Sequence, residues 1–241
     1  MSDFTEARER MVERQIVRRG IRDPRVLAAM RCVPREAFVP ADLRNLAYED
    51  RPLPIGNEQT ISQPAIVARM IEAAELGPAD VVLDVGTGSG YAAAVAAAIV
   101  AHVHSIERQA ALAQTARAIL ARLGIVNVSI YFGDGTLGLA DHAPYNAIIA
   151  AAGGPRVPAA WREQLAAGGR IVMPVGRERH YQRLIKLVRR GPDDYERTVL
   201  GDVSFVPLLG ADAWPSGTTR PCNEASAEDE EKPGNRDRDE H

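Results

Sequence analysis

The chain has 241 residues, of which 46% are hydrophobic and 25% charged, and its formal net charge is −3. This composition predicts one globular domain large enough to bury a core. The longest apolar stretch, residues 91–101, is too short to span a bilayer, and the charged N-terminus differs from a signal peptide, so we expect a cytoplasmic protein without a membrane partner. Cys32 and Cys222 have no metal or disulfide spacing, and we expect them to be unreactive.

The charge is concentrated at the C-terminal end. Residues 223–241 carry a net charge of −5, which leaves about +2 for the rest of the chain. We predict a linker and an acidic, disordered, solubilising tail over residues 211–241. The nearly neutral body lacks the positive charge that nucleic-acid binding requires, so we expect no nucleic-acid partner.

Two helices are predicted before any strand. Residues 3–20 place apolar side chains among charges and end at Gly20, and residues 23–30 open with Asp23 before Pro24, a typical N-cap. The next segments, "VPREAFVP" and "AYEDRPLPIG", are rich in proline and glycine and should be extended and irregular. Residues 1–63 are therefore predicted to form N-terminal helices and a segment that wraps toward the substrate side.

From residue 64 onward, short β-branched runs alternate with helical stretches, which predicts a βαβ series and a doubly wound, mostly parallel sheet. We expect two antiparallel strands to finish this sheet, "YQRLIKLVRR" and "VSFVPLLG", and the core to span residues 64–210. The predicted parallel strands are residues 81–86, 102–107, 128–134, 145–152 and 168–176.

The stretch "VLDVGTGSGYAAAVAA" joins a strand to a helix through a glycine loop, so backbone must pass close to a ligand at the carboxyl edge of the sheet. It departs from the dinucleotide fingerprint because position 91 is Tyr and the third glycine comes one residue early. A G-x-G-x-G loop after an acidic strand end suits S-adenosylmethionine, and Asp84 would face its cationic end directly or through water.

Two further carboxylates follow the next strands. Glu107 ends the second strand, where it can accept both ribose hydroxyls, and Asp134 ends the third, where it can accept from the adenine amine while Gly135 lets the ring lie close. Each alone could be a solvated acid, but three in register indicate a Rossmann-like, class I S-adenosylmethionine-dependent methyltransferase with an N-terminal helical extension. The predicted cofactor-binding residues are Asp84, Gly86, Gly88, Ser89, Gly90, Glu107, Asp134 and Gly135.

Nucleic-acid acceptors are disfavoured by two absences. The fourth strand ends in "AAAGGP" where amino methylation of bases uses a Pro-Pro-aromatic turn, and neither cysteine lies near these loops to serve C5 methylation.

The chain resembles the protein-L-isoaspartate (D-aspartate) O-methyltransferase family in "RVLAAMRCVPREAFVP", "QTISQP", "VLDVGTGSGY", "YNAIIAAAG", "LAAGGRIVMPVG" and "VSFVPLLG", in that family's order over residues 8–210.

The resemblance implies methylation of the free α-carboxylate of L-isoaspartyl, and possibly D-aspartyl, residues in damaged proteins and peptides; the ester then closes to a succinimide that partly reopens as aspartate. Ser62 matches the family's active-site serine, and we assign it to orienting the carboxylate, with Gln59, Thr60 and Ile61 as substrate-positioning residues. A carboxylate is already ionised near pH 7 and needs no base. Alternatively, Ser62 and Gln63 only cap the next helix, with Pro64 in its first turn.

Some features keep other interpretations open. Glu58 adds a carboxylate beside the "QTIS" motif, and Ala65 stands where many members carry a larger residue, so a related carboxylate acceptor or a cofactor-binding relative without repair activity are alternatives. His102 and His104 share one strand face, but no third ligand is evident, so they are interpreted as ordinary polar residues and no metal is predicted. We expect a monomer.

Overall fold

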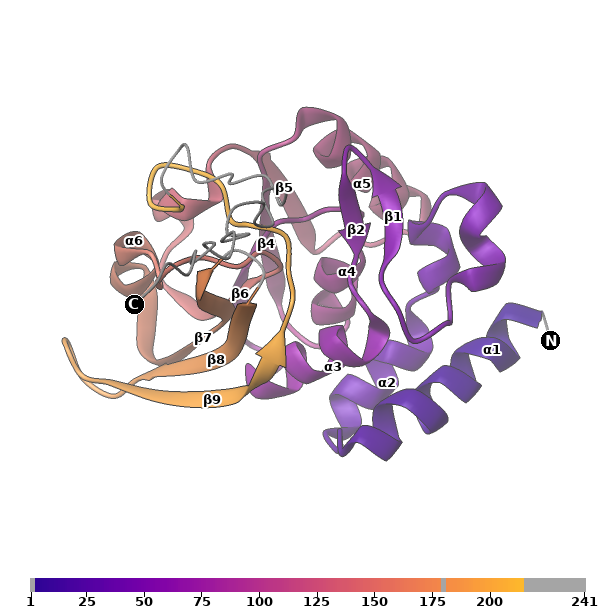
Figure 1. Ribbon diagram of the computed structural model, residues 1–241, viewed down its shortest axis with the longest axis horizontal. Helices are drawn as coiled ribbons and strands as arrows, with labels where there is room; N and C mark the ends of the chain where they lie inside the picture. The colour runs from indigo at the N-terminus through magenta and orange to yellow at the C-terminus, as the bar shows by residue number, and fades with distance from the viewer. Residues whose placement is uncertain (1–2, 179–180, 215–241) are drawn as a thin grey trace, which may run out of the picture.

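The central sheet has seven strands in the order β5-β4-β3-β6-β7-β8-β9 over residues 3–178 and 181–214, the part of the chain that the computed structural model describes (Figure 1). Strands β3 to β7 are parallel, and β8 is antiparallel to both of its neighbours. The predicted doubly wound, mostly parallel fold is therefore confirmed. The strands are β3 Val81–Val85, β4 His102–Glu107, β5 Val128–Phe132, β6 Tyr145–Ala150, β7 Leu165–Glu178, β8 Tyr181–Arg189 and β9 Tyr195–Val203, with a separate hairpin of β1 Leu53–Gly56 and β2 Gln59–Ile61.

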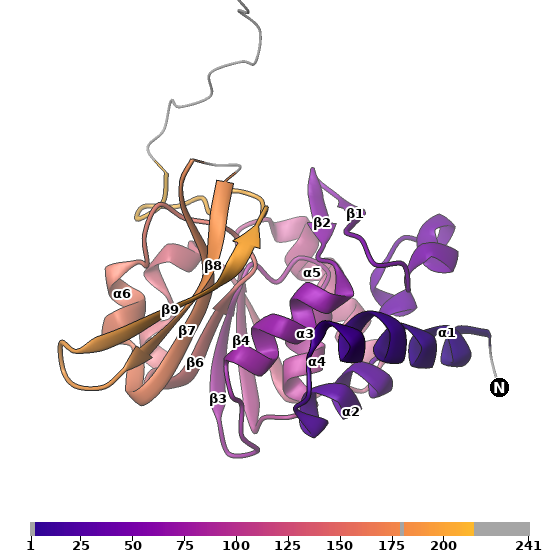
Figure 2. The same ribbon diagram turned by 60° about the horizontal axis from the view of Figure 1, so that its bottom comes forward.

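Helices α1 to α5 lie on one side of the sheet and α6 on the other (Figure 2). The α-helices are α1 Asp3–Met11, α2 Pro24–Cys32, α3 Pro64–Ala73, α4 Tyr91–Ala97, α5 Ala110–Arg122 and α6 Ala159–Glu163. The remaining turns are a π-helix, η1 Val12–Ile16, and the 3-10 helices η2 Val17–Arg19, η3 Arg35–Phe38, η4 Ala41–Leu46, η5 Gly135–Leu137 and η6 Ala140–His142.

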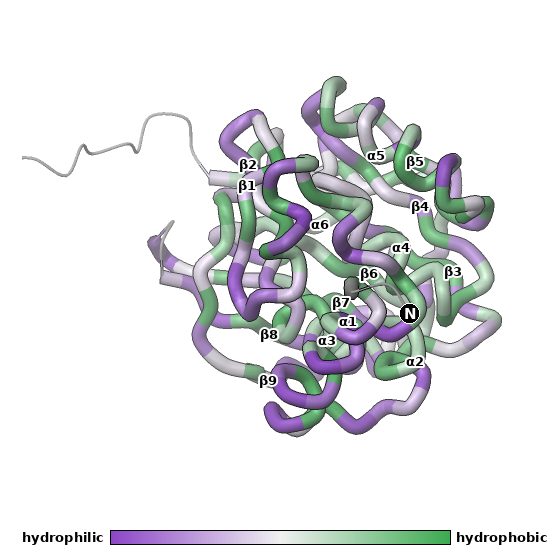
Figure 3. The backbone as a smooth tube through the Cα atoms, turned by 90° about the vertical axis from the view of Figure 1, so that its right-hand side faces the viewer, coloured by the Kyte–Doolittle hydropathy of each residue, from purple (hydrophilic) through white to green (hydrophobic). Residues whose placement is uncertain are grey.

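Both faces of the sheet are buried because successive strand residues point to opposite sides. In β3, Val82 joins the apolar cluster under α1 to α5, whereas Leu83 joins the cluster under α6, which is centred on the fully buried Trp161. Figure 3 shows the hydrophobic stretches of β3 and α4 in green and the charged residues of α1 in purple. Two-sided burial explains why β3 and β6 read as nearly continuous apolar runs in the sequence, whereas β5 at the edge of the sheet is only partly buried.

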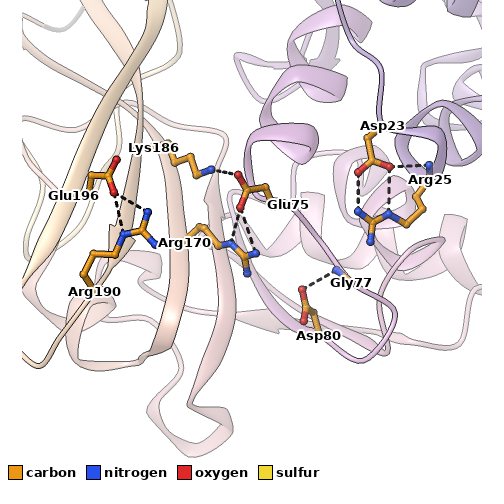
Figure 4. Close-up of polar contacts among 9 residues, drawn as sticks. All are labelled: Asp23, Arg25, Glu75, Gly77, Asp80, Arg170, Lys186, Arg190 and Glu196. Carbon is orange, nitrogen blue, oxygen red and sulfur yellow. Dashed lines mark hydrogen bonds and ion pairs between the residues drawn. The ribbon is translucent and has the colours of Figure 1, made fainter.

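The N-terminal helices form as predicted. The helical run that begins with α1 ends at Gly20, whose φ of 92° is left-handed, and the Asp23 side chain accepts a hydrogen bond from Arg25 N–H at 2.8 Å (Figure 4). Met11 and Met30 are buried in the same apolar cluster as Val82, so this layer and the sheet share one core. The division of the chain at residues 63/64 and 210/211 stays a prediction.

Glu75 ties the end of α3 to the sheet (Figure 4). Its carboxylate pairs with Lys186 of β8 and with Arg170 Nε of β7, the latter at 3.4 Å. The hydrogen bond from Lys186 is the largest of several contributions that lower the pKa of Glu75. The carboxylate is more than half exposed, so these pairs orient α3 more than they stabilise it.

Two local predictions are wrong. The segment "VPREAFVP" is not extended throughout, because η3 forms a helical turn over Arg35–Phe38. The last strand is not residues 203–210, because β9 spans Tyr195–Val203. A turn over residues 191–194 connects β8 to β9 and sets their antiparallel register. After Val203 the chain leaves the sheet, and Pro207 forms only an isolated bridge with Gly153. Proline cannot donate to a strand ladder, which favours this departure.

No helix within the described residues is long and apolar enough to cross a membrane. Cys32 is a free, exposed thiol. Cys222 and most of the predicted tail, residues 215–241, lie outside the described residues.

Candidate functional site

The glycine loop, residues 86–90, connects the carboxyl end of β3 to the start of α4. Gly86 and Gly90 have φ angles of 88° and 91°, a left-handed conformation that residues with a Cβ rarely adopt. A Cβ added to Gly88 would lie 3.3 Å from Ile55 Cδ1 of the β1–β2 hairpin. The loop therefore requires glycine both for its conformation and for its close approach to the hairpin.

Glu107 holds this loop from the end of β4. One carboxylate oxygen accepts the Gly88 N–H and the other accepts the Gln109 N–H, both at 2.9 Å. The residue is only 6% exposed, yet its side chain lines a cavity at the carboxyl edge of the sheet. Two backbone donors hold the carboxylate in one orientation, and each oxygen keeps a lone pair for a further donor.

Asp84 lies deeper. It is 3% exposed, and its carboxylate accepts a hydrogen bond from Ser105 Oγ at 2.6 Å. Burial raises the pKa of Asp84 to about 6; the Ser105 hydrogen bond lowers it and the negative charge of Glu107 raises it further. Asp84 is not among the residues that line the cavity, so it can act on a ligand only through water or through the loop.

Asp134 caps the short helix η5. Its carboxylate accepts from Thr136 N–H at 2.9 Å, from Thr136 Oγ at 2.7 Å and from Ala211 N–H at 2.7 Å. Burial raises the pKa of Asp134, but these hydrogen bonds outweigh it and the net pKa is lowered. Gly135 lines the cavity, and a Cβ there would lie 2.6 Å from Val85 Cγ1. Asp134 therefore shapes the cavity wall and holds the chain that follows β9.

The cavity is closed by two segments that come from distant parts of the sequence. Gln59 and Thr60 of β2 contribute one wall, and the segment 206–209 contributes the other. Gln109 Nε2 donates to Asn57 O at 3.4 Å, which links the hairpin to the residues after β4. The cavity thus lies between the ends of β3 and β4 and these two covering segments.

Thr60 also lines a wider groove that contains Ser62. This groove runs between the start of α3 and the segment 202–207, with Gln63 and Ile66 on the helix side. A small hollow lined by Thr60, Ser62 and the glycine-loop residue Ser89 joins the groove to the loop. Ser62 therefore stands between the groove and the glycine loop.

The helix-cap alternative for Ser62 is wrong. The N-cap residue of α3 is Gln63, and it makes no side-chain cap hydrogen bond. The Ser62 side chain is half-buried, and its hydroxyl forms no hydrogen bond with another described residue. Ile61, by contrast, is 4% exposed and packs in the core opposite Leu53, so it can contribute to the groove mainly through its backbone.

The two residues that complicated the sequence pattern lie apart from the groove. Glu58 is exposed at the tip of the hairpin, where Asn57 and Glu58 have φ angles of 51° and 58°. Ala65 is buried on α3 at 4% exposure. Neither lines the groove that contains Ser62.

His102 and His104 lie at the start of β4, away from the cavity lining. His102 Nε2 contacts Ser129 Oγ at 3.0 Å, and the His104 ring stacks on His142 with centroids 4.3 Å apart. Burial, with the neighbouring His102 and His142, lowers the pKa of His104 to about 4. Within residues 3–178 and 181–214, no group of three or more His, Cys, Asp or Glu side chains is arranged to hold a metal ion.

Two parts of the site were missed in the sequence. The segment 206–209 was assigned to a strand, although Pro207 within it cannot donate to a strand ladder. Thr87 and Ser105 were not singled out, and their hydroxyls lie 2.5 Å apart beneath the glycine loop. Nothing in the local sequence indicates that contact, because it depends on how β3 pairs with β4.

An open sheet with a glycine loop and carboxylates at successive strand ends defines a Rossmann-like, class I methyltransferase fold. The family model described as protein-L-isoaspartate(D-aspartate) O-methyltransferase (PCMT) matches residues 6–213. The chain belongs to this family, as the sequence resemblance predicted.

Relatives and solved structures agree with that assignment. A protein-L-isoaspartate O-methyltransferase of Rhodopseudomonas palustris is 57% identical over 213 residues, covering 87% of this chain and 98% of the relative. One from Pelobacter propionicus is 57% identical over 207 residues, covering 86% and 92%. A solved protein-L-isoaspartate O-methyltransferase superposes with a TM-score of 0.76 at 29% identity, covering 86% of this chain and 67% of that one. A Plasmodium falciparum protein described as a beta-aspartate methyltransferase in complex with S-adenosyl-L-homocysteine has the same fold, with a TM-score of 0.71 at 24% identity, covering 87% and 99%.

Proposed function

We propose that the protein transfers the methyl group of S-adenosylmethionine to the free α-carboxylate of L-isoaspartyl residues in damaged proteins and peptides, which starts their repair through a succinimide. The observation that carries this proposal is the position of Ser62, between a groove open to solvent and the glycine loop. Relatives more than half identical over nearly their whole length have names that state this activity.

The cavity fits the nucleoside part of the cofactor. Glu107 has acceptor lone pairs for the ribose hydroxyls, and its backbone partners fix their direction. Gly86 and Gly88 leave room for close approach of a ligand to the backbone, and Gly135 does the same at the adenine end. Asp84 provides a buried negative charge below the loop, suited to the cationic end of the cofactor through water. Asp134 is assigned to the adenine amine, although its hydrogen bonds in the structure also serve η5.

The groove provides the acceptor side. When bound, S-adenosylmethionine supplies a methyl group activated by its sulfonium. The Ser62 hydroxyl can donate one hydrogen bond to the acceptor carboxylate, and Thr60, which lines both the groove and the cavity, can donate another. Gln59 lines the cavity and would donate from that side. None of the three adds a positive charge that would hold this anion too tightly. The segment 202–207 and Thr60 of the hairpin flank the groove, where a bound peptide would displace water from the reacting groups. No described histidine or lysine lines the groove as a base, and a carboxylate needs none.

The further parts of the proposal concern partners and location. We expect the protein to act as a monomer in the cytoplasm, without nucleic-acid or membrane partners. The near-neutral body of the chain supports the absence of a nucleic-acid partner. Light scattering on the full chain tests the monomer, and fractionation of cells that express it tests the location.

The activity is tested with two synthetic peptides that differ only in isoaspartate or aspartate at one position. We expect base-labile labelling from S-adenosylmethionine carrying a radioactive methyl group on the isoaspartyl peptide alone. Equal labelling of both peptides would refute the acceptor specificity. Labelling of neither, with cofactor binding intact, would refute the repair activity and favour another carboxylate acceptor.

A further inference from the structure

Three buried polar side chains form a chain between the sheet and the glycine loop. Asp84 of β3, Ser105 of β4 and Thr87 of the loop are 3%, 0% and 4% exposed. The parallel register pairs Asp84 with Ser105, so both side chains point to the face under α3 and α4. Ser105 Oγ lies 2.6 Å from Asp84 Oδ2 and 2.5 Å from Thr87 Oγ1.

The direction of these hydrogen bonds follows from the number of protons. The Ser105 hydroxyl has one proton and donates it to the Asp84 carboxylate, which is an acceptor only when ionised. Thr87 must therefore donate to Ser105 Oγ. The next residue, Gly88, donates its N–H to Glu107. Two consecutive loop residues are thus held by the two carboxylates of β3 and β4.

Nothing in the packing of β4 requires a hydroxyl at position 105. Val103, two residues earlier on the same face, is apolar and fully buried, and the residue paired with Ser105 on β5 is Ile130. A buried hydroxyl is costly unless it is hydrogen-bonded. A small apolar residue at position 105 could not form the hydrogen bonds that Ser105 donates to Asp84 and accepts from Thr87.

We propose that Ser105 is a positioning residue for cofactor binding: its hydroxyl joins the Asp84 carboxylate to Thr87 and so fixes the glycine loop in the conformation that receives S-adenosylmethionine. This proposal rests on the cofactor assignment made above. It assigns a role to a residue in the middle of a strand, which touches neither cavity nor groove.

The hydrogen bond from Ser105 also affects the ionisation of Asp84. Within the described residues, Glu107 is the charged group whose electrostatic interaction shifts the pKa of Asp84. On the β6 side, the residue paired with Asp84 is the apolar Ile149. Burial raises the pKa of Asp84 to about 6, and the hydrogen bond from Ser105 opposes that rise. Removal of the Ser105 hydroxyl should therefore raise the pKa further and neutralise Asp84 at a higher pH.

The test measures the dissociation constant of S-adenosylhomocysteine by calorimetry from pH 5.5 to 8 for four variants. Ser105→Ala should weaken binding about tenfold at pH 7.5. Affinity declines as the pH falls and Asp84 becomes protonated, and in Ser105→Ala this decline should begin about one pH unit higher than in the parent protein. Thr87→Val should weaken binding without moving that pH, because Ser105 still donates to Asp84. Thr87→Ser keeps the hydroxyl and should bind like the parent protein.

Ser129→Ala on the adjacent strand is the matched control, since it deletes a hydroxyl that contacts only His102 in the described residues. Circular dichroism checks that each variant is folded. Unchanged affinity and an unchanged pH profile in folded Ser105→Ala would overturn the proposal, as would equal losses in Thr87→Val and Thr87→Ser. Failure of the parent protein to bind S-adenosylhomocysteine would refute the cofactor assignment and this proposal with it, whereas binding without peptide methylation would refute only the acceptor.

Discussion

Glu107 and Ser62 mark two sides of one site that are built in different ways. The Glu107 carboxylate is buried and accepts two backbone N–H groups at 2.9 Å, whereas the Ser62 hydroxyl is half-buried and bonds to no other described residue. The cofactor side is therefore organised before any ligand arrives. On the acceptor side, no hydrogen bond to another described residue fixes the Ser62 hydroxyl, so it can turn toward a substrate. Substitutions should separate the two sides: changes to the first alter cofactor affinity and stability, and changes to the second alter transfer to the peptide.

The largest effect is expected for Asp84→Asn, which removes a buried charge. The folded pKa of about 6 lies above the ordinary 3.8, so protonated Asp84 contributes stability that is fully present below pH 3.8 and lost as the pH rises through 6. At pH 7 the variant should therefore unfold with a free energy about 3 kcal/mol higher than the parent, while cofactor binding is lost. Urea unfolding between pH 5 and 7.5 measures this, and a variant less stable than the parent at pH 7 would contradict it.

Glu107→Ala should weaken the binding of S-adenosylhomocysteine about a hundredfold, because charge-assisted hydrogen bonds to the loop and to the ribose are lost together. At saturating cofactor, the rate of peptide methylation should fall much less. Calorimetry and steady-state kinetics measure the two quantities. Glu196→Ala, which removes an exposed carboxylate paired with Arg190, is the control. An unchanged affinity of Glu107→Ala for S-adenosylhomocysteine would refute the assignment of Glu107 to the ribose hydroxyls.

Ser62→Ala should reduce kcat/KM for the isoaspartyl peptide about tenfold, the loss expected for one hydrogen bond to a charged group. Cofactor affinity should stay within about twofold, since no loop contact is removed. Ser129→Ala, with the same deletion on β5, should leave both quantities unchanged. A full methylation rate in Ser62→Ala would end the positioning role, and a large loss of cofactor affinity would show that the two sides are not separable.

The smallest effect is expected for Glu58→Gln. Glu58 is exposed at the hairpin tip, so its repulsion of an anionic peptide is weak and screened by salt. KM for the isoaspartyl peptide should fall about twofold at low ionic strength and be unchanged in 0.15 M salt. A larger effect that persists in high salt would mean that Glu58 reaches into the groove when the peptide binds.

Strands β3 and β6 were predictable because they are buried on both faces and read as apolar runs. Strand β4 and the partly buried edge strand β5 were predictable from their spacing between helical stretches. The limits of β4 agree with the predicted residues 102–107. The last strand was not predictable in the same way, since β9 is largely exposed and polar, and pairing with β8 decides its position. The apolar segment that follows it, residues 204–210, contributes to the site and leaves the sheet.

In the site, too, some residues could be predicted from the sequence and others could not. Asp84, Glu107 and the glycines were predicted because strand ends of a parallel sheet meet at one edge. Their contacts were not predicted: the link from Thr87 through Ser105 to Asp84 joins residues up to 21 positions apart through the register of two strands. Ser62 was identified through the family resemblance, and its access to the glycine loop depends on tertiary packing of the hairpin.

A crystal structure of the protein with S-adenosylhomocysteine and an isoaspartyl peptide would show whether Glu107 and Ser62 hold the cofactor and the acceptor. We expect both ribose hydroxyls to lie within about 2.6–3.2 Å of the Glu107 carboxylate, and the isoaspartyl carboxylate to lie at the same distance from Ser62 Oγ. A peptide carboxylate held by other side chains, with Ser62 turned away from it, would refute the role of Ser62 in orienting the acceptor.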